Sequence, residues 1–222
     1  IKVLSTVFMI VLLSACQSVE KNTKLIAGTF NTATNIQMKM LDRFAPPDVI
    51  VHNNIPYQAS PELNVDIYQP KNIEQLNAMP TVVWIHGGGW VGGHTRHSGA
   101  LSNFPQVLAR LASEGFVVAS LEYRLSGEAP FPAQLQDARA AIRFLKDNAA
   151  KYGIDASRVG VWGGSAGGHL TALVATSCGE TGVDPKPAPS GSECVQAAVT
   201  WYGVFDFEPM LKRSIWSTVH LT

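Results

Sequence analysis

Charged side chains are scarce in this chain of 222 residues, because Asp, Glu, Lys and Arg together make up only 15% of it. Typical soluble domains contain about 25%. The 17 basic and 17 acidic side chains cancel to a net charge of zero, so charge gives no reason to expect nucleic acid or an acidic surface as a partner. Low charge together with 46% hydrophobic residues predicts a domain whose sheet is largely buried.

The sequence also lacks internal repeats and low-complexity tracts, which excludes solenoids and propellers. Long hydrophobic runs are absent apart from one near the N-terminus, where Lys2 is followed by the apolar stretch from Val3 to Leu13. This stretch is too short to span a bilayer as a stable helix. The length of the remaining chain fits one domain with a sizeable core.

The apolar stretch ends in Leu13-Ser14-Ala15-Cys16, which resembles the bacterial lipobox, whose cysteine is lipidated and becomes the first mature residue. By this resemblance, residues 1–15 are expected to be a lipoprotein signal peptide and Cys16 the site of lipidation. Gln17, in place of aspartate, suits sorting to the outer membrane. We therefore expect an exported, periplasmic protein that contacts the membrane only through its lipid. The alternative is an ordinary secretory signal that ends in a chance cysteine.

Residues 16–47 are polar and weakly patterned and are expected to form a tether, so residues 48–222 make up the folded domain. Only two other cysteines are present. Cys178 and Cys194 flank a segment rich in Gly, Pro and Ser, and in an oxidising periplasm they are candidates for a disulfide. In a cytosolic protein they would instead be free thiols. No ligands with zinc-like spacing lie near them, which argues against a metal site.

Short apolar runs alternate with helical patterns along the domain. Two antiparallel strands are expected first, then a right-handed series of strands and helices in a parallel sheet covered on both faces. The expected strands are 49–51, 63–68, 80–85, 116–121, 159–162 and 195–202, and the expected helices are 101–112, 134–151 and 170–175. The fold class is therefore α/β, with a mostly parallel, doubly wound sheet whose ligands bind at the C-terminal ends of the strands.

The fifth of these strands runs directly into Gly163-Gly164-Ser165-Ala166-Gly167, and a helical run follows. This is the pattern of a nucleophile elbow, a strained turn that exposes a serine hydroxyl at the edge of a sheet. Glycines two residues before and two residues after the serine let the strand and the helix pass close together. Ser165 is therefore the candidate nucleophile.

A second glycine motif follows the third predicted strand, where Ile85 is succeeded by His86-Gly87-Gly88-Gly89-Trp90. In lipases and esterases such a loop donates backbone N–H groups to the oxyanion hole. The candidate donors here are Gly88, Gly89 and Ala166. Two ordinary glycine turns after buried strands are the alternative, but the order and the context of both motifs favour an enzyme.

With these motifs in place, the chain resembles the α/β-hydrolase carboxylesterases, in particular the hormone-sensitive-lipase-like and bacterial feruloyl or acetyl esterase branch. The resemblance runs from about Asn64 to Phe207. It rests on the two glycine motifs and on Tyr123-Arg124-Leu125, Phe131-Pro132-Ala133 and Tyr152-Gly153-Ile154-Asp155.

The resemblance implies a serine esterase that acts through an acyl-enzyme on a small-molecule ester, without a metal or an organic cofactor. Gly164 stands where many lipase-like members carry aspartate, which hints at acetyl or feruloyl esters of polysaccharides. The alternatives are a non-catalytic binding module on the same scaffold and a related serine peptidase.

The chain departs from the family after the nucleophile, because the resemblance requires an acid and a histidine beyond two further strands. Asp206 and His220 occur in the right order, but Asp206 comes one strand too early and no strand follows to carry His220. We therefore expect the triad partners of Ser165 to lie beyond residue 222, the last strands of the sheet to be missing, and the chain as it stands to be inactive.

Other polar and aromatic candidates have simpler interpretations. His86 is expected to brace the glycine loop, and His169 to pack on the nucleophile helix. His94 and His97 stand three residues apart near Arg96, a spacing that could bind metal on a helix, but no carboxylate is close in sequence, so surface positions are expected. Asp137 and Arg139 are expected at a solvated or capped helix start. Trp84 and Trp162 are expected in the core, whereas Trp90, next to the oxyanion glycines, is the candidate for the wall of a substrate pocket.

Overall fold

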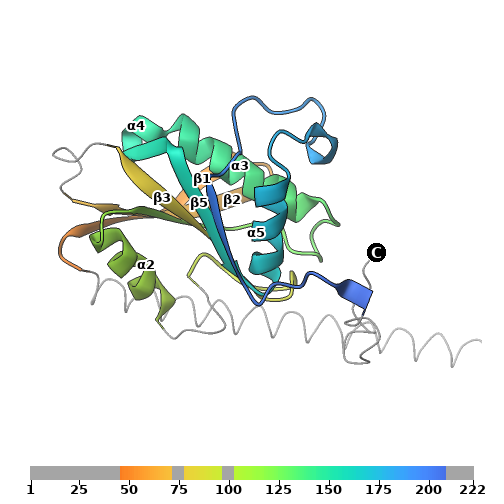
Figure 1. Cartoon of the computed structure of the whole chain (residues 1–222), viewed down its shortest axis with the longest axis horizontal. Helices are drawn as coiled ribbons and strands as arrows, with labels where there is room; N and C mark the ends of the chain where they lie inside the picture. The colour runs from red at the N-terminus through yellow and green to blue at the C-terminus, as the bar shows by residue number, and fades with distance from the viewer. Residues whose placement is uncertain (1–45, 72–77, 97–102, 209–222) are drawn as a thin grey trace, which may run out of the picture.

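A computed structural model of the chain describes residues 46–71, 78–96 and 103–208. In this part of the chain, six strands form one sheet in the order β1-β2-β4-β3-β5-β6 (Figure 1). The strands are β1 Val49–Ala59, β2 Glu62–Pro70, β3 Met79–Ile85, β4 Val117–Leu121, β5 Ile154–Gly164 and β6 Ala197–Trp201. The helices are α2 Phe104–Ser113, α3 Ala133–Asp147, α4 Ala149–Tyr152 and α5 Ala166–Thr176, and a short 3-10 turn covers Thr181–Val183.

The pairing of the strands confirms the predicted mixed sheet. β1 and β2 are antiparallel, and β2 joins β4 in antiparallel fashion. The pairs β4–β3, β3–β5 and β5–β6 are all parallel. β3 lies between β4 and β5, so the loops that follow β3 and β5 leave the sheet side by side. This order places the two glycine motifs next to each other.

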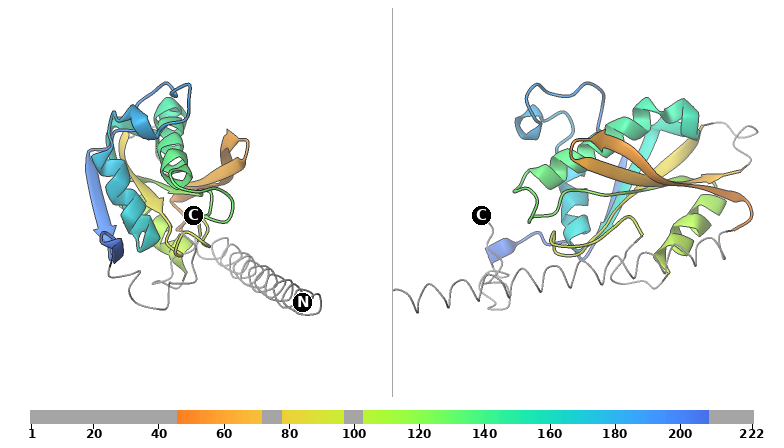
Figure 2. Two further views of the ribbon diagram at one scale, coloured as in Figure 1. Left: turned by 90° about the vertical axis from the view of Figure 1, so that its right-hand side faces the viewer. Right: turned by 180° about the vertical axis from the view of Figure 1, so that it is seen from behind.

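Helices cover both faces of the sheet, as predicted. α2 packs on one face against a core that contains Trp84, Phe104 and Leu108, while α3 and α5 lie on the other face (Figures 1 and 2). The larger core lies under α3 and α5 and is built from aliphatic side chains of alternate strand positions, among them Val83 and Val161. Both faces of β3 and β4 are therefore buried, which explains their nearly continuous apolar sequences.

Several predicted boundaries differ from those in the structure. The helix predicted over 134–151 is divided, because α3 ends at Asp147 and a separate turn of helix, α4, begins at Ala149. Gly153 ends α4 in the left-handed conformation with a φ of 64°. The nucleophile strand, predicted over 159–162, is longer in the structure, because β5 begins at Ile154 with an irregular stretch between the pairs Met79–Ile154 and Thr81–Val159. Ser157 donates its backbone N–H there to the Asp155 carboxylate at 2.9 Å.

β6 is an edge strand in the described part of the chain, paired with β5 alone. All five of its residues are exposed, and Val199 retains 51% of its surface. Trp201 packs edge-on against Trp162 of β5, with their ring centroids 4.7 Å apart. The edge of the sheet beside Ser165 therefore presents apolar side chains to solvent.

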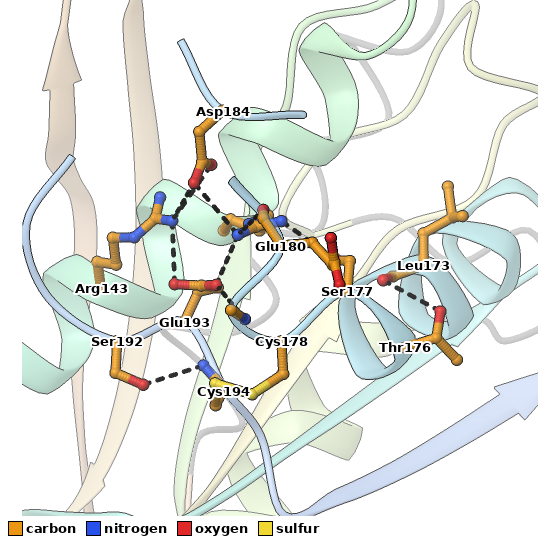
Figure 3. A network of polar contacts seen from close by, with 12 residues as sticks. Arg143, Leu173, Thr176, Ser177, Cys178, Glu180, Asp184, Ser192, Glu193 and Cys194 are labelled. Carbon is orange, nitrogen blue, oxygen red and sulfur yellow. Dashed lines mark hydrogen bonds and ion pairs between the residues drawn. A yellow bond between two sulfur atoms is a disulfide. The ribbon is translucent and has the colours of Figure 1, made fainter. Parts of the chain in front are cut away.

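A buried ionic network fastens the segment after α5 to α3 (Figure 3). Arg139 lies 2.5 Å from Glu193 and 3.2 Å from Asp184, and Arg143 lies 3.0 Å and 3.1 Å from the same two carboxylates. All four side chains are at least 94% buried. The prediction that Arg139 belongs to a solvated or capped helix start is wrong, because the side chain is fully buried. Its partners are 45 and 54 residues away, and no local sequence pattern indicates them.

Cys178 and Cys194 form a disulfide in the structure, at the edge of this ionic network (Figure 3). Cys178 follows Ser177, the residue that caps the C-terminus of α5, and two residues separate Cys194 from the start of β6. The disulfide and the two arginines therefore fix the same 16-residue connection, one at its ends and the other along its length.

We predict that replacing both cysteines by serine lowers the free energy of unfolding by about 3 kcal/mol, because a loop of this length then regains its freedom in the unfolded chain. Urea unfolding of the full-length protein under oxidising conditions measures the change. Dithiothreitol should destabilise the wild type by a similar amount and leave the double variant unchanged. Equal stability of the oxidised wild type and the variant would contradict the prediction.

We also predict that Arg139→Met lowers the free energy of unfolding by about 3 kcal/mol, because two buried carboxylates lose a counter-charge. Arg158→Met is the matched control, since Arg158 pairs with Asp155 at 2.6 Å but keeps 55% of its side chain exposed. The control should leave stability nearly unchanged in the same urea titration. A loss no larger than that of the control would show that the buried network is not a source of stability.

Candidate active site

Ser165 lies at the corner between β5 and α5 in a strained backbone conformation, with φ 57° and ψ −122°. Such a conformation costs a non-glycine residue about 1–3 kcal/mol and persists only where its surroundings enforce it. The backbone N–H of Ser165 donates to Trp201 of β6 at 2.9 Å, and its carbonyl accepts from His169 of α5 at 3.0 Å. Contacts on both sides thus hold the corner.

The glycines that flank Ser165 are required by the close passage of the neighbouring backbone. A Cβ atom on Gly163 would lie 2.4 Å from the carbonyl oxygen of Gly167. A Cβ atom on Gly167 would lie 2.0 Å from that of Ile85, the last residue of β3. The strand, the helix and β3 meet here without room for side chains, as the spacing of the motif predicted.

Gly164 has a different neighbour, because the Tyr202 side chain occupies the space beside it. A Cβ atom on Gly164 would lie 2.9 Å from the Tyr202 hydroxyl oxygen and 3.1 Å from its ring. An aspartate at this position would therefore have to displace the tyrosine. This packing gives a physical reason for glycine at position 164.

The loop after β3 reaches Ser165 through its own glycines. A Cβ atom on Gly87 would lie 2.8 Å from the carbonyl oxygen of Gly164 and 3.4 Å from Cβ of Ser165. Gly88 and Gly89 have φ values of 116° and 62°, which favour glycine, and a Cβ on Gly88 would lie 2.0 Å from the carbonyl oxygen of Gly92. The structure thus places the two predicted motifs in direct contact.

Three backbone N–H groups at this junction are free of backbone partners in the described residues, namely those of Gly88, Gly89 and Ala166. Ala166 is the first residue of α5, and N–H groups in the first turn of a helix have no intrahelical acceptor. The positive end of the helix dipole lies at the same place. An anion placed there would be stabilised by hydrogen bonds and by the dipole together.

His86 braces the start of the loop, as its position in the sequence suggested. Its ring is 1% exposed and stacks on Tyr123 with the centroids 4.2 Å apart. Its Nδ1–H donates to the carbonyl oxygen of Gly87 at 2.7 Å, and the Tyr123 hydroxyl donates to the carbonyl oxygen of His86 at 2.9 Å. Burial raises the pKa of Tyr123, so its phenol stays protonated and remains a donor.

An aromatic cluster lies beside the junction and is formed by Trp90, His169 and Phe207. The His169 ring meets Trp90 and Phe207 edge-on, with centroid distances of 5.4 Å and 5.2 Å. Burial lowers the pKa of His169, which favours the neutral ring near pH 7. Trp84, which is 1% exposed, lies in the core as predicted, and the half-buried Trp162 packs against the same core with its ring centroid 4.6 Å from that of Trp84.

Three further polar residues, on α3 and near the end of the glycine loop, pair with side chains that are distant in sequence. Arg96 is 2% exposed and lies 2.7 Å from Asp66 of β2. Asp137 of α3 accepts from both the side chain and the backbone of Arg124. His94 Nε2 lies 3.1 Å from Glu122 Oε1, just beyond β4. The partners are distant in sequence, so single residues gave no signal of these contacts.

The remaining candidates do not complete a triad in the described residues. Asp206 is exposed, and its carboxylate accepts the backbone N–H of Glu208 at 3.1 Å. No described side chain forms a hydrogen bond with the Ser165 hydroxyl. Cys16, His97 and His220 lie outside the described residues.

The described residues contain no cluster of histidine, cysteine and carboxylate side chains suited to a metal ion. Among these residues, no helix combines the length and the hydropathy that a transmembrane segment needs.

Comparison with known proteins places the chain among esterases. Over 150 residues it is 34% identical to carboxylesterase NlhH of Mycobacterium tuberculosis, an alignment that covers 67% of this chain but 44% of the relative. A bifunctional GH43-CE protein of Bacteroides eggerthii is 34% identical, with a TM-score of 0.62 over 73% of this chain and 24% of that one. A truncated carbohydrate esterase from gut microbiota is also 34% identical, with a TM-score of 0.55 over 69% of this chain and 56% of that one.

The chain therefore spans less than half the length of the curated relative to which it is similar. The family model described as BD-FAE matches residues 65–220, which include both glycine motifs. From this match, together with the sheet order and the strained serine corner, we conclude that the chain belongs to the BD-FAE family and has an α/β-hydrolase fold.

Proposed function

We propose that the protein is a serine carboxylesterase and that Ser165 is its nucleophile. One observation carries the proposal: the strained Ser165 corner lies against the glycine loop of β3, where a Cβ on Gly87 would come within 3.4 Å of Ser165 Cβ. A structural turn has no need to hold a serine under strain beside free backbone donors. An acyl-transfer site needs this combination.

In the proposed reaction, the Ser165 hydroxyl attacks an ester carbonyl while a general base takes its proton. The carbonyl oxygen becomes negative and accepts hydrogen bonds from the N–H groups of Gly88, Gly89 and Ala166. One such donor is typically worth about 3 kcal/mol in the transition state. The alcohol then leaves, and water hydrolyses the acyl-enzyme.

For the substrate, we propose carboxylic esters carried by polysaccharides, with acetyl or feruloyl groups as the acids. The support is the likeness to a carbohydrate esterase and to a GH43-CE protein, together with Gly164 before the nucleophile. The cluster of Trp90, His169 and Phe207 would supply an apolar, aromatic wall near the acyl group. The proposed chemistry uses no metal or organic cofactor.

We further propose that the protein is an exported lipoprotein, anchored through Cys16 in the periplasmic face of the outer membrane. The N-terminal Leu13-Ser14-Ala15-Cys16 supports this location, and so does the Cys178–Cys194 disulfide, since disulfides persist mainly outside the cytosol. The lipid would be the only contact with the membrane.

We predict that Ser165→Ala lowers kcat/KM for p-nitrophenyl acetate at least about a thousandfold in the full-length protein, because no other group supplies the nucleophile. The matched control is Ser157→Ala, which removes an exposed serine from the irregular part of β5 and should leave activity unchanged. Equal activity of the wild type and Ser165→Ala would reject Ser165 as nucleophile. The wild type must be expressed to its natural stop codon, so that the triad partners expected beyond residue 222 are included. An inactive wild type of that length would favour a binding module, and cleavage of peptide amides in place of esters would favour a peptidase.

We predict that Cys16→Ala moves the protein from the detergent-extracted membrane fraction to the soluble fraction and abolishes incorporation of labelled palmitate. The neighbouring substitution Ser18→Ala should change neither result. Continued labelling of Cys16→Ala would contradict lipidation at this cysteine, and a soluble, unlabelled wild type would favour an ordinary secretory signal.

A further inference from the structure

The end of the glycine loop is anchored by three consecutive side chains. Residues 87–96, all of them described, contain neither helix nor strand, so the direction of their N–H groups depends on contacts at the two ends of the loop. At its end, His94, Thr95 and Arg96 turn toward β2 and β4. Arg96 pairs with the buried Asp66, and the carbonyl oxygen of Thr95 accepts from the Ser120 hydroxyl.

Each ring nitrogen of His94 lies within hydrogen-bond distance of another side chain. Nδ1 lies 3.0 Å from the Thr95 hydroxyl oxygen, and that hydroxyl donates to the Asp66 carboxylate at 2.8 Å. Nε2 lies 3.1 Å from Glu122 Oε1 and is the donor in this contact, because a carboxylate oxygen only accepts. The ring therefore links Thr95 in the loop to Glu122 beyond β4.

Two adjacent residues, Glu122 and Tyr123, contact the two ends of the glycine loop. Tyr123 stacks on His86 at the start of the loop, and Glu122 faces His94 near its end. The second oxygen of Glu122 accepts the backbone N–H of Asn64 at 3.0 Å, which ties the carboxylate to β2. Burial raises the pKa of Glu122, but the hydrogen bonds from His94 and Asn64 outweigh it and leave the pKa lowered.

The middle of the loop has little freedom once both ends are fixed. A Cβ atom on Gly93 would lie 2.1 Å from Nδ1 of His86, so the end of the loop packs directly on its start. Gly88 accepts the N–H groups of Val91 and Gly92, each at 3.2 Å. A displacement of His94 would therefore reach the N–H groups of Gly88 and Gly89 through these contacts.

We propose that His94, through its contact with Glu122, is a positioning residue that holds the oxyanion loop in the geometry required for catalysis. The inference rests on the proposed esterase function, because it assigns the Gly88 and Gly89 N–H groups to the oxyanion. His94 itself does not touch the reacting atoms. Its contribution should appear in the transition state, where the oxyanion develops, and should hardly alter the binding of the ester.

Two conservative variants separate the two contacts of the His94 ring. The amide nitrogen of His94→Gln can take the place of Nε2 and donate to Glu122, whereas the amide of His94→Asn takes the place of Nδ1 beside the Thr95 hydroxyl. His94→Leu removes both contacts. His52→Leu is the matched control, because His52 of β1 is another half-buried histidine, whose ring forms one hydrogen bond, to the side chain of Gln69 on β2 at 2.8 Å.

The test measures kcat and KM for p-nitrophenyl acetate in the full-length protein. We expect His94→Leu to lower kcat about tenfold and to change KM less than about twofold, since small misplacements of catalytic groups are costly. His94→Gln should recover most of kcat, and His94→Asn should not. The proposal is overturned if His94→Leu lowers kcat no more than His52→Leu does, if the loss appears in KM, or if Asn and Gln recover kcat equally.

Amide hydrogen exchange of the peptide that spans residues 87–96 gives a readout that does not depend on turnover. His94→Leu should accelerate exchange in this peptide, while His52→Leu should leave it unchanged. If the wild type is inactive but exchange in the loop still accelerates in His94→Leu, the esterase function is rejected while the role of His94 in holding the loop stands. Unchanged exchange in His94→Leu would overturn the proposal that His94 positions the loop, whatever the activity.

Discussion

At Ser165 the chain turns from β5 into α5 with a positive φ that a serine adopts only under constraint, and most of the site follows from how that turn is enforced. The backbones of β3, β5 and α5 approach so closely that Gly87, Gly163 and Gly167 have no space for a Cβ atom. The same close approach brings the glycine loop against the serine. The strained backbone of Ser165, the spacing of the glycines and the free N–H groups are therefore all consequences of the close approach of β3, β5 and α5.

The close approach of these elements is supported by polar contacts between residues that are distant from Ser165 in sequence. Beyond the C-terminal end of β4, Glu122, Tyr123 and Arg124 hold α3 and the glycine loop after β3. At the opposite end of α5, the disulfide and the buried Arg139–Arg143 network tie the helix to α3 and to the start of β6. α5 is thus fixed at both ends, which keeps its first turn aimed at Ser165.

The local parts of this arrangement could be predicted from sequence, because they depend on short-range rules. Alternation in β2, the apolar runs of β3 and β4, and the glycine spacing around Ser165 each reflect the geometry of a few consecutive residues. The local sequence pattern did not predict which charged side chains are buried and paired. The partners of Arg96, Asp137 and Arg139 lie 13 to 54 residues away, and only the folded chain brings them together.

The sequence by itself determined the α/β architecture, the serine corner and the glycine loop, since periodicity and glycine placement encode backbone geometry directly. The tertiary structure decided how these pieces are held, because ion pairs and hydrogen bonds between distant segments depend on strand order and packing. The order β4-β3-β5 brings the two glycine motifs into contact and sets Glu122 opposite His94. The sequence around Glu122 or around His94 does not by itself specify the contact between them.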